Sequence, residues 1–173
     1  MLYISRFMKN DGFTMVELVI TVAVLLFGII SVYNAFYPFI PLAYSMNERF
    51  IAIYLGQEGM EVIRNIRDNN FINHRIWTVG LMGCNNGCQA DYKTGTSVET
   101  SNNRLKPYKN NNFLKLNSDG FYSYDPGNDV KFKRKITIRT ISTDTLKVNV
   151  LVMWDYNGQP FSLEIIGYLY NWY

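Results

Sequence analysis

Residues suited to chemistry lie near the N-terminus, in the segment Gly12-Phe13-Thr14-Met15-Val16-Glu17-Leu18. Cleavage between Gly12 and Phe13 would remove a basic leader and create a free amine on Phe13. Glu17 follows about one helical turn later, so its carboxylate is placed to pair with an α-amine, either its own or that of a neighbour. The simpler alternative is a signal anchor, in which Glu17 extends to the lipid headgroups or lies beside an unpaired helix N–H.

An uncharged apolar run follows Glu17 and extends from Leu18 to Tyr33. From Met15 to Tyr37 there are about 23 residues with one ionisable group, which is enough to cross a bilayer as a helix. A carboxylate deep in such a helix costs about 2–3 kcal/mol, so Glu17 needs a compensating interaction. A secretory signal peptide carries its cleavage site after the apolar core. Here the candidate site precedes the core, so cleavage after Gly12 would retain the helix.

At these residues the sequence resembles the type IV pilin and pseudopilin superfamily. That family is marked by a short basic leader, a Gly, a Phe-Thr pair, two apolar residues, a Glu and an apolar helix. The resemblance implies that a prepilin peptidase cuts after Gly12 and methylates the new N-terminus at Phe13. It also implies an assembly role for Glu17, with Thr14 in the same motif, through pairing with the N-terminal amine of a neighbouring subunit. Asp11 departs from the family pattern, in which a basic residue is commoner before the Gly.

The charges that flank the apolar run predict its orientation. Arg6 and Lys9 precede the run, whereas the first charges after it, Glu48 and Arg49, cancel. The positive-inside rule therefore places the leader in the cytoplasm and the chain beyond about Tyr44 outside. The resemblance implies that this single-pass membrane protein then enters an extracellular pilus filament. Its implied partners are other pilins, the prepilin peptidase, the inner-membrane assembly machinery and, before assembly, membrane lipid.

A second helix is expected from about Ala43 to about Asp68. Pro38 and Pro41 should kink or break the helix before it, because each lacks an N–H donor. Asp68-Asn69-Asn70 should end it. An apolar stripe recurs at spacings of three and four residues: Ala52, Leu55, Gly59, Val62 and Ile66. We place the charged side chains on other faces of the helix: Glu48, Glu58, Glu61, Arg64 and Arg67. Glu61 and Arg64 are an i,i+3 pair.

The last third of the chain shows the alternation of half-buried strands. Three segments show this alternation: Lys133 to Ile141, Leu146 to Trp154, and Phe161 to Leu169. Asn157-Gly158 supplies a two-residue turn between the last two segments. Phe113–Leu116 and Phe121–Tyr124 predict a further short hairpin, and the polar segment 93–112 predicts a long loop. The expected fold class is α+β, with a long N-terminal helix packed on a C-terminal antiparallel sheet, which is also the pilin fold.

The expected organisation has four parts: a leader at 1–12, a transmembrane or filament-core helix at 13–42, an amphipathic stem helix at 43–70 and an extracellular β-rich head at 71–173. High aromatic content, 16% of residues, suits a β-rich head.

Two cysteines, Cys84 and Cys88, enclose Asn-Asn-Gly. Outside the membrane this spacing favours a local disulfide. Zinc requires four ligands, or three and a water, and the chain has one histidine, His74. We therefore expect a disulfide, with no metal and no cofactor.

The segment Asp125-Pro126-Gly127-Asn128-Asp129 carries oxygen ligands that calcium accepts, on Asp125, Asn128 and Asp129. It is shorter than an EF-hand loop and lacks the terminal Glu. These residues are also common in turns, so a plain turn is the preferred interpretation.

The sequence contains no nucleophile elbow, no zinc-protease helix motif and no P-loop, which predicts a protein that is not an enzyme. The resemblance favours a structural subunit. The segments Glu58–Asp68 and Leu169–Trp172 are similar to minor pilins known as type IV pilus modification proteins of the V type. A secretion pseudopilin and a competence pilin have the same type of N-terminal motif and stay open as alternatives.

A membrane-anchored binding module, for adhesion or for DNA, is a further alternative. The segment Lys131–Lys135 places cations beside Phe132, where they could contact phosphates. An edge strand protected from aggregation by its charges is the preferred explanation. The net charge of +3 is too small to argue for a nucleic acid partner, although it does not exclude one.

Overall fold

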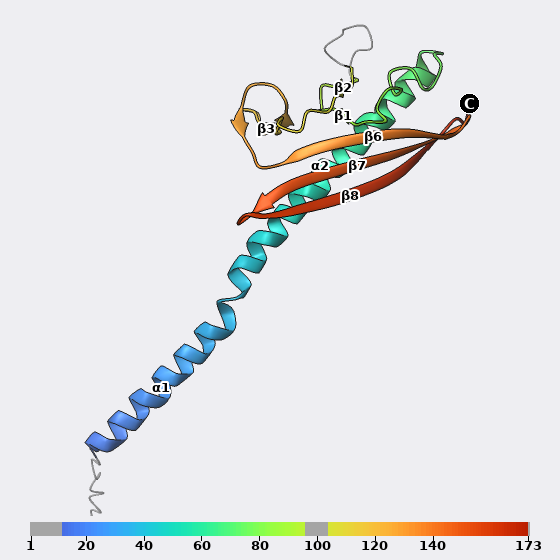
Figure 1. The fold of residues 1–173 in the computed structure, drawn as a ribbon. Coiled ribbons are helices and arrows are strands. Elements are labelled where there is room, and N and C mark those ends of the chain that lie inside the picture. Colours follow the sequence, from blue (N-terminus) through green and yellow to red (C-terminus); the bar gives the residue numbers. More distant parts are fainter. Residues whose placement is uncertain (1–11, 96–103, 173) are drawn as a thin grey trace, which may run out of the picture. The chain divides into compact units, whose positions relative to one another are not determined.

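The computed structural model describes residues 12–95 and 104–172. Helices come first in the chain and antiparallel strands follow, which confirms the α+β class (Figure 1). The chain divides after Tyr44 into two units, and the second begins at Ser45. The predicted leader lies outside the described residues except for Gly12, as does 96–103 within the predicted loop.

The first unit holds α1 (Met15–Phe36), a helix with no buried residue. It ends at Tyr37, whose N–H donates to the carbonyl oxygen of Tyr33 at 2.9 Å. The predicted break is found at Pro38, because α2 (Phe39–Ile72) begins at the next residue. Pro41 lies in the first turn of α2. Backbone N–H groups in a first turn have no intrahelical acceptor, so a proline there costs the helix no hydrogen bond.

In the second unit, α2 buries the predicted stripe: Ala52, Leu55, Gly59, Val62 and Ile66. Glycine is required for the close approach of the helix to the sheet. A Cβ at Gly59 would lie 2.9 Å from Val150 Cγ1 and 3.0 Å from Arg134 Cδ. The predicted pair between Glu61 and Arg64 is present on the exposed face, at 2.5 Å.

The main sheet has five antiparallel strands in the order β2-β1-β6-β7-β8. The predicted meander forms its larger part: β6 (Lys133–Ser142), β7 (Thr145–Tyr156) and β8 (Gln159–Tyr170). Asn157 and Gly158 join the last two strands with φ of 54° and 77°, the left-handed pair that a two-residue hairpin needs. Two strands that the sequence did not predict extend the sheet: β1 (Cys88–Gln89) and β2 (Lys106–Pro107).

A smaller sheet has the order β4-β3-β5. Its strands β3 (Lys115–Leu116) and β4 (Tyr122–Ser123) are the predicted short hairpin. The predicted turn at 125–129 is wrong in its last two residues. Asn128 and Asp129 form β5 (Asn128–Asp129), which pairs with β3 on the side away from β4.

Two expectations for α2 are wrong. Asn70 does not end the helix, which continues to Ile72. Its buried amide instead donates to the carbonyl oxygens of Trp77 at 3.1 Å and Val79 at 2.8 Å, so it holds the chain that follows. Glu48 does not lie on an exposed face. It is 8% exposed and pairs with the ammonium of Lys131, which lowers the cost of burying its carboxylate.

Arg134, on the inner face of β6, is completely buried, with 0% exposure. Its guanidinium donates to the carbonyl oxygen of Leu55 on α2 at 2.8 Å and to that of Ala90 at 2.5 Å. The carboxylate of Glu58, also on α2, lies 3.3 Å away. One side chain therefore joins the helix, the sheet and the segment after β1.

This burial corrects the interpretation of Lys131–Lys135 as a DNA-contacting segment, because Arg134 cannot reach a phosphate. Two other cations of the segment lie over aromatic rings, Lys133 at 5.1 Å from the centroid of Phe113 and Lys135 at 5.4 Å from that of Tyr108. The edge-strand explanation needs a correction as well, because β6 has β1 on one side and β7 on the other. The pairing with β1 is limited to Cys88 and Ile136, outside Lys131–Lys135.

Arg134→Met is expected to lower the free energy of unfolding by about 3 kcal/mol, because two buried carbonyl groups and the Glu58 carboxylate lose their donor. Urea unfolding of the full chain in detergent micelles, followed by tryptophan fluorescence, measures the loss. Lys147→Met is the control, since it removes a partly exposed cation from β7 and should change stability by less than about 0.5 kcal/mol. Equal effects of the two substitutions would contradict the assigned role of Arg134.

Tyr124 predicts a dependence of stability on alkaline pH. Burial raises the pKa of its hydroxyl, which donates to the Arg134 carbonyl oxygen at 3.2 Å, to about 12. An unfolded chain loses this proton at a pH of about 10. The stabilising contribution is therefore complete below that pH and is lost as the pH rises towards about 12. When the pH rises from about 9 to about 11, the free energy of unfolding of the wild type should fall by about 1.4 kcal/mol more than that of Tyr124→Phe. Parallel losses in the two proteins would contradict the prediction.

Candidate functional site

Thr14 begins α1 and places Glu17 in its first turn. Thr14 has extended backbone angles, and its Oγ1 accepts a hydrogen bond from the Glu17 N–H at 3.2 Å. Its carbonyl oxygen accepts from the Leu18 N–H at 3.1 Å, which is the first hydrogen bond of the helix. A Thr followed three residues later by Glu is the spacing of a capping box. This signal is present in the sequence but was not used to predict the start of the helix.

The peptide bond between Gly12 and Phe13 precedes the helix and is open to solvent. Both residues are exposed, without regular secondary structure. A Cβ built on Gly12 would meet no atom within 4 Å. A peptidase that binds an extended segment therefore has access to this bond.

Glu17 is exposed and lies in the first turn of α1, at the positive end of the helix dipole. Within the part of the chain that the structure describes, no ion pair with its carboxylate is found. Its position one turn from Phe13 leaves the carboxylate available to an amine outside this helix.

The surface of α1 matches an apolar environment. Its two internal hydroxyls are satisfied within the helix: Thr21 donates to the carbonyl oxygen of Glu17 and Ser31 to that of Phe27, each at 2.7 Å. The helical segment that begins at Met15 is long and apolar enough to cross a membrane. No residue of α1 is buried.

Cys84 and Cys88 form the predicted disulfide, with their Cα atoms 5.3 Å apart. Gly87 adopts a φ of 106° inside the loop that the disulfide closes, and β1 begins at Cys88. The pair thus lies in the second unit and positions the turn that leads into the sheet, while the N-terminal motif lies in the first unit.

Two of the three residues considered for calcium carry ion pairs of their own. Asp125 pairs with Lys93 at 2.5 Å, an interaction that raises the pKa of the lysine mainly through the hydrogen bond between them. Asp129 pairs with Lys115 at 3.5 Å. Over residues 12–95 and 104–172, no group of three or more His, Cys, Asp or Glu side chains is arranged to hold a metal ion.

The comparison with protein families decides how the N-terminal segment is understood. A family model described as the prokaryotic N-terminal methylation motif matches residues 7–33. The chain carries a prepilin-type methylation motif. This match is consistent with the type IV pilin superfamily and includes the Gly12–Phe13 bond, the Thr14 cap, Glu17 and most of α1. Comparisons with curated proteins and with solved structures give no match.

The prepilin-type motif implies processing by a prepilin peptidase and assembly with other pilins, and it points to a structural subunit. Together with the unburied apolar surface of α1, it indicates a single-pass membrane anchor.

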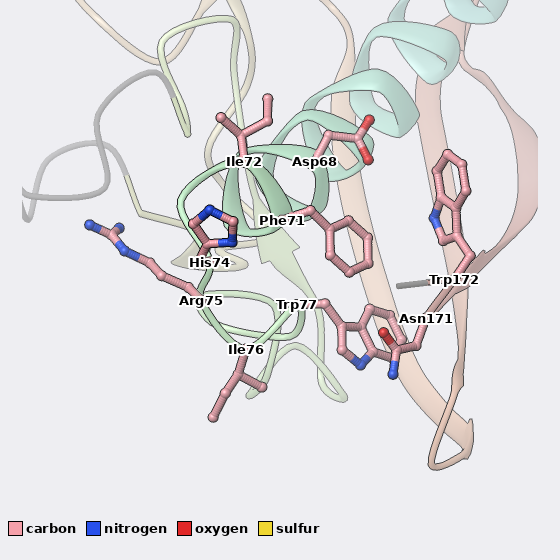
Figure 2. A pocket seen from close by; sticks show the side chains of 9 residues that line it. All are labelled: Asp68, Phe71, Ile72, His74, Arg75, Ile76, Trp77, Asn171 and Trp172. Atoms are coloured by element: carbon pink, nitrogen blue, oxygen red, sulfur yellow. The ribbon is translucent and has the colours of Figure 1, made fainter.

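A cleft at the C-terminal end of α2 was not predicted. It has a volume of about 660 Å³, and its lining includes Phe71, Trp77 and Trp172 (Figure 2). Sequence patterns contain no signal for it, because Trp172 is remote in sequence from the other two rings.

Proposed function

We propose that this chain is a minor type IV pilin that is cut after Gly12, methylated at Phe13 and assembled into a pilus or used to prime one. The observation that carries the proposal is the prepilin-type motif at residues 7–33, together with an apolar helix, α1, of which no residue is buried within the part of the chain that the structure describes. The similarity of Glu58–Asp68 and Leu169–Trp172 to V-type minor pilins favours a minor subunit. A secretion pseudopilin or a competence pilin would use the same N-terminal chemistry.

The exposed apolar surface of α1 accounts for both stages of this function. Before assembly, lipid covers the helix and removes its apolar side chains from water. After assembly, the helices of neighbouring subunits provide the cover. Transfer between these environments preserves the apolar contacts, so the energy that selects the correct register must come from a polar interaction.

Glu17 is suited to supply that interaction. The Thr14 cap fixes the start of α1 and therefore the position of the carboxylate in the first turn. A neighbour's Phe13 amine would neutralise the carboxylate as both groups leave water. An unpaired Glu17 in the same surroundings would carry the full desolvation cost. Addition of a subunit to the filament in the wrong register is therefore disfavoured.

The proposed organisation follows from these roles. The leader, residues 1–12, lies in the cytoplasm until it is removed. Residues 13–42 form the membrane and filament helix, 43–70 form the stem, and 71–173 form the extracellular head. A DNA-binding module receives less support than sequence alone gave it, because Arg134 is buried and neighbouring lysines lie over aromatic rings.

Glu17→Ala tests the assembly role. The variant should enter the membrane normally, because the substitution makes the helix more apolar. It should reach sheared filaments at least about tenfold less than wild type, because the amine of the neighbour loses its partner. Immunoblots of membrane and filament fractions from the host measure this ratio.

Glu61→Ala is the matched control, because it removes an exposed carboxylate that pairs only with Arg64 among the described charged side chains. It should assemble as wild type does. Normal incorporation of Glu17→Ala would contradict the assembly role.

A further inference from the structure

Segments far apart in the sequence of the second unit form the cleft at the C-terminal end of α2. Phe71 comes from the last turn of α2, Trp77 from the turn after it, and Trp172 from the segment that follows β8 (Figure 2). Two residues after the end of α2, His74 adopts the left-handed conformation, at a φ of 51°. The Arg75 N–H then donates to the carbonyl oxygen of Asn70 at 2.8 Å, which turns the chain back so that Trp77 lies near Phe71.

Aromatic rings form the walls of the cleft. Trp77 is buried, whereas Trp172 is 67% exposed, which is unusual for so large an apolar side chain. Phe71 meets Trp172 edge to face, with ring centroids 6.3 Å apart. The guanidinium of Arg67 lies 5.3 Å from the Trp172 centroid and also holds that ring in place. An exposed tryptophan held at the side of a cleft offers a ligand a flat apolar surface.

Polar groups of both hydrogen-bonding kinds lie beside these rings. The Asp68 side chain is partly exposed, and one of its oxygens accepts from Arg67 at 2.8 Å, which leaves acceptor capacity on the other. Asn171 uses one amide hydrogen on Asp144 at 3.1 Å and retains a further donor and an acceptor. The cleft therefore combines an apolar surface with both donors and acceptors.

The charges in the cleft argue against an ionic ligand. Arg67 lies outside the lining of the cleft, pairs with Asp68 and covers one face of Trp172, so that face of the ring is closed to a ligand cation. Arg75 extends away from the three rings, so it offers no cationic group to an anion between them (Figure 2). A neutral ligand with an apolar face and several hydroxyl groups fits both conditions.

We propose that this cleft binds a neutral saccharide chain, with the C–H face of one sugar ring on Trp172 and hydroxyl groups hydrogen-bonded to Asp68 and Asn171. Its volume of about 660 Å³ lies within the usual range of small-ligand sites and accommodates more than one sugar ring. The site is independent of the proposed pilin function, because it lies in the second unit and uses no residue of the N-terminal motif.

The test uses the full-length chain in micelles of a polyoxyethylene detergent, which has no sugar headgroup to compete. An array of neutral glycans, followed by calorimetric titration with the free oligosaccharide of the best ligand, measures the dissociation constant. Trp172→Ala should weaken binding about tenfold or more, and Trp172→Phe should restore part of the affinity. Tyr168→Ala, which removes a half-exposed aromatic ring from β8 outside the cleft, should leave affinity unchanged.

Failure of every neutral glycan to bind the wild-type chain would overturn the proposal, as would equal affinity of Trp172→Ala and wild type. Tetramethylammonium is the probe for the rival chemistry. Tetramethylammonium binding that Trp172→Ala abolishes would show that the rings form a cation cage instead. None of these results depends on processing at Gly12, so failure here leaves the pilin proposal intact.

Discussion

The fold of the second unit depends on one buried cation. The Arg134 guanidinium lies inside the unit formed by residues 45–172 and donates to backbone carbonyl groups on both α2 and the segment after β1. A charge in this position is tolerated because both terminal nitrogens of the guanidinium donate to these carbonyl groups and because Glu58 lies beside it. The buried Nε has no hydrogen-bond partner among the described residues. The same arrangement favours Gly59, because a Cβ there would lie 2.9 Å from Val150 Cγ1 and 3.0 Å from Arg134 Cδ. The distance between helix and sheet, and the course of the chain around Ala90, are therefore fixed together.

In the second unit, α2 covers the sheet and buries its own apolar stripe. No residue of α1 is buried in the same way within the described part of the chain. Most side chains of α1 are apolar. A free energy of roughly 25 cal/mol per Å² of exposed apolar surface favours any environment that removes this helix from water. Lipid and the helices of other subunits both do so. In the proposed function, Glu17, positioned by the Thr14 cap, distinguishes the correct arrangement from others, because its desolvation must be compensated.

Local periodicity predicted much of this fold, because it reports which faces are buried. The α2 stripe and the strands β6 to β8 follow from it directly. Strands of two residues, such as β1, show no such pattern and depend on partners distant in sequence. Arg134 and Glu48 were placed wrongly because of their charge, although their positions already indicated burial. Arg134 shares the inward face of β6 with Ile136 and Ile138.

The candidate site was predictable to a different degree. The cleavage bond, the cap and the carboxylate at the N-terminus are contiguous, so one segment contains the whole motif. The disulfide followed from the four-residue separation and the single histidine. The aromatic cleft depends on the turn after α2 meeting the end of β8, which is a tertiary contact that no local pattern reports.

The most direct test of the account is the intact mass and N-terminal sequence of the protein isolated from its own host, compared with a strain that lacks the prepilin peptidase. The account predicts a chain that begins at N-methylated Phe13 in the wild-type strain and at Met1 in the mutant. A chain that begins at Met1 in both strains would show a plain signal anchor and would contradict the assignment as a processed pilin.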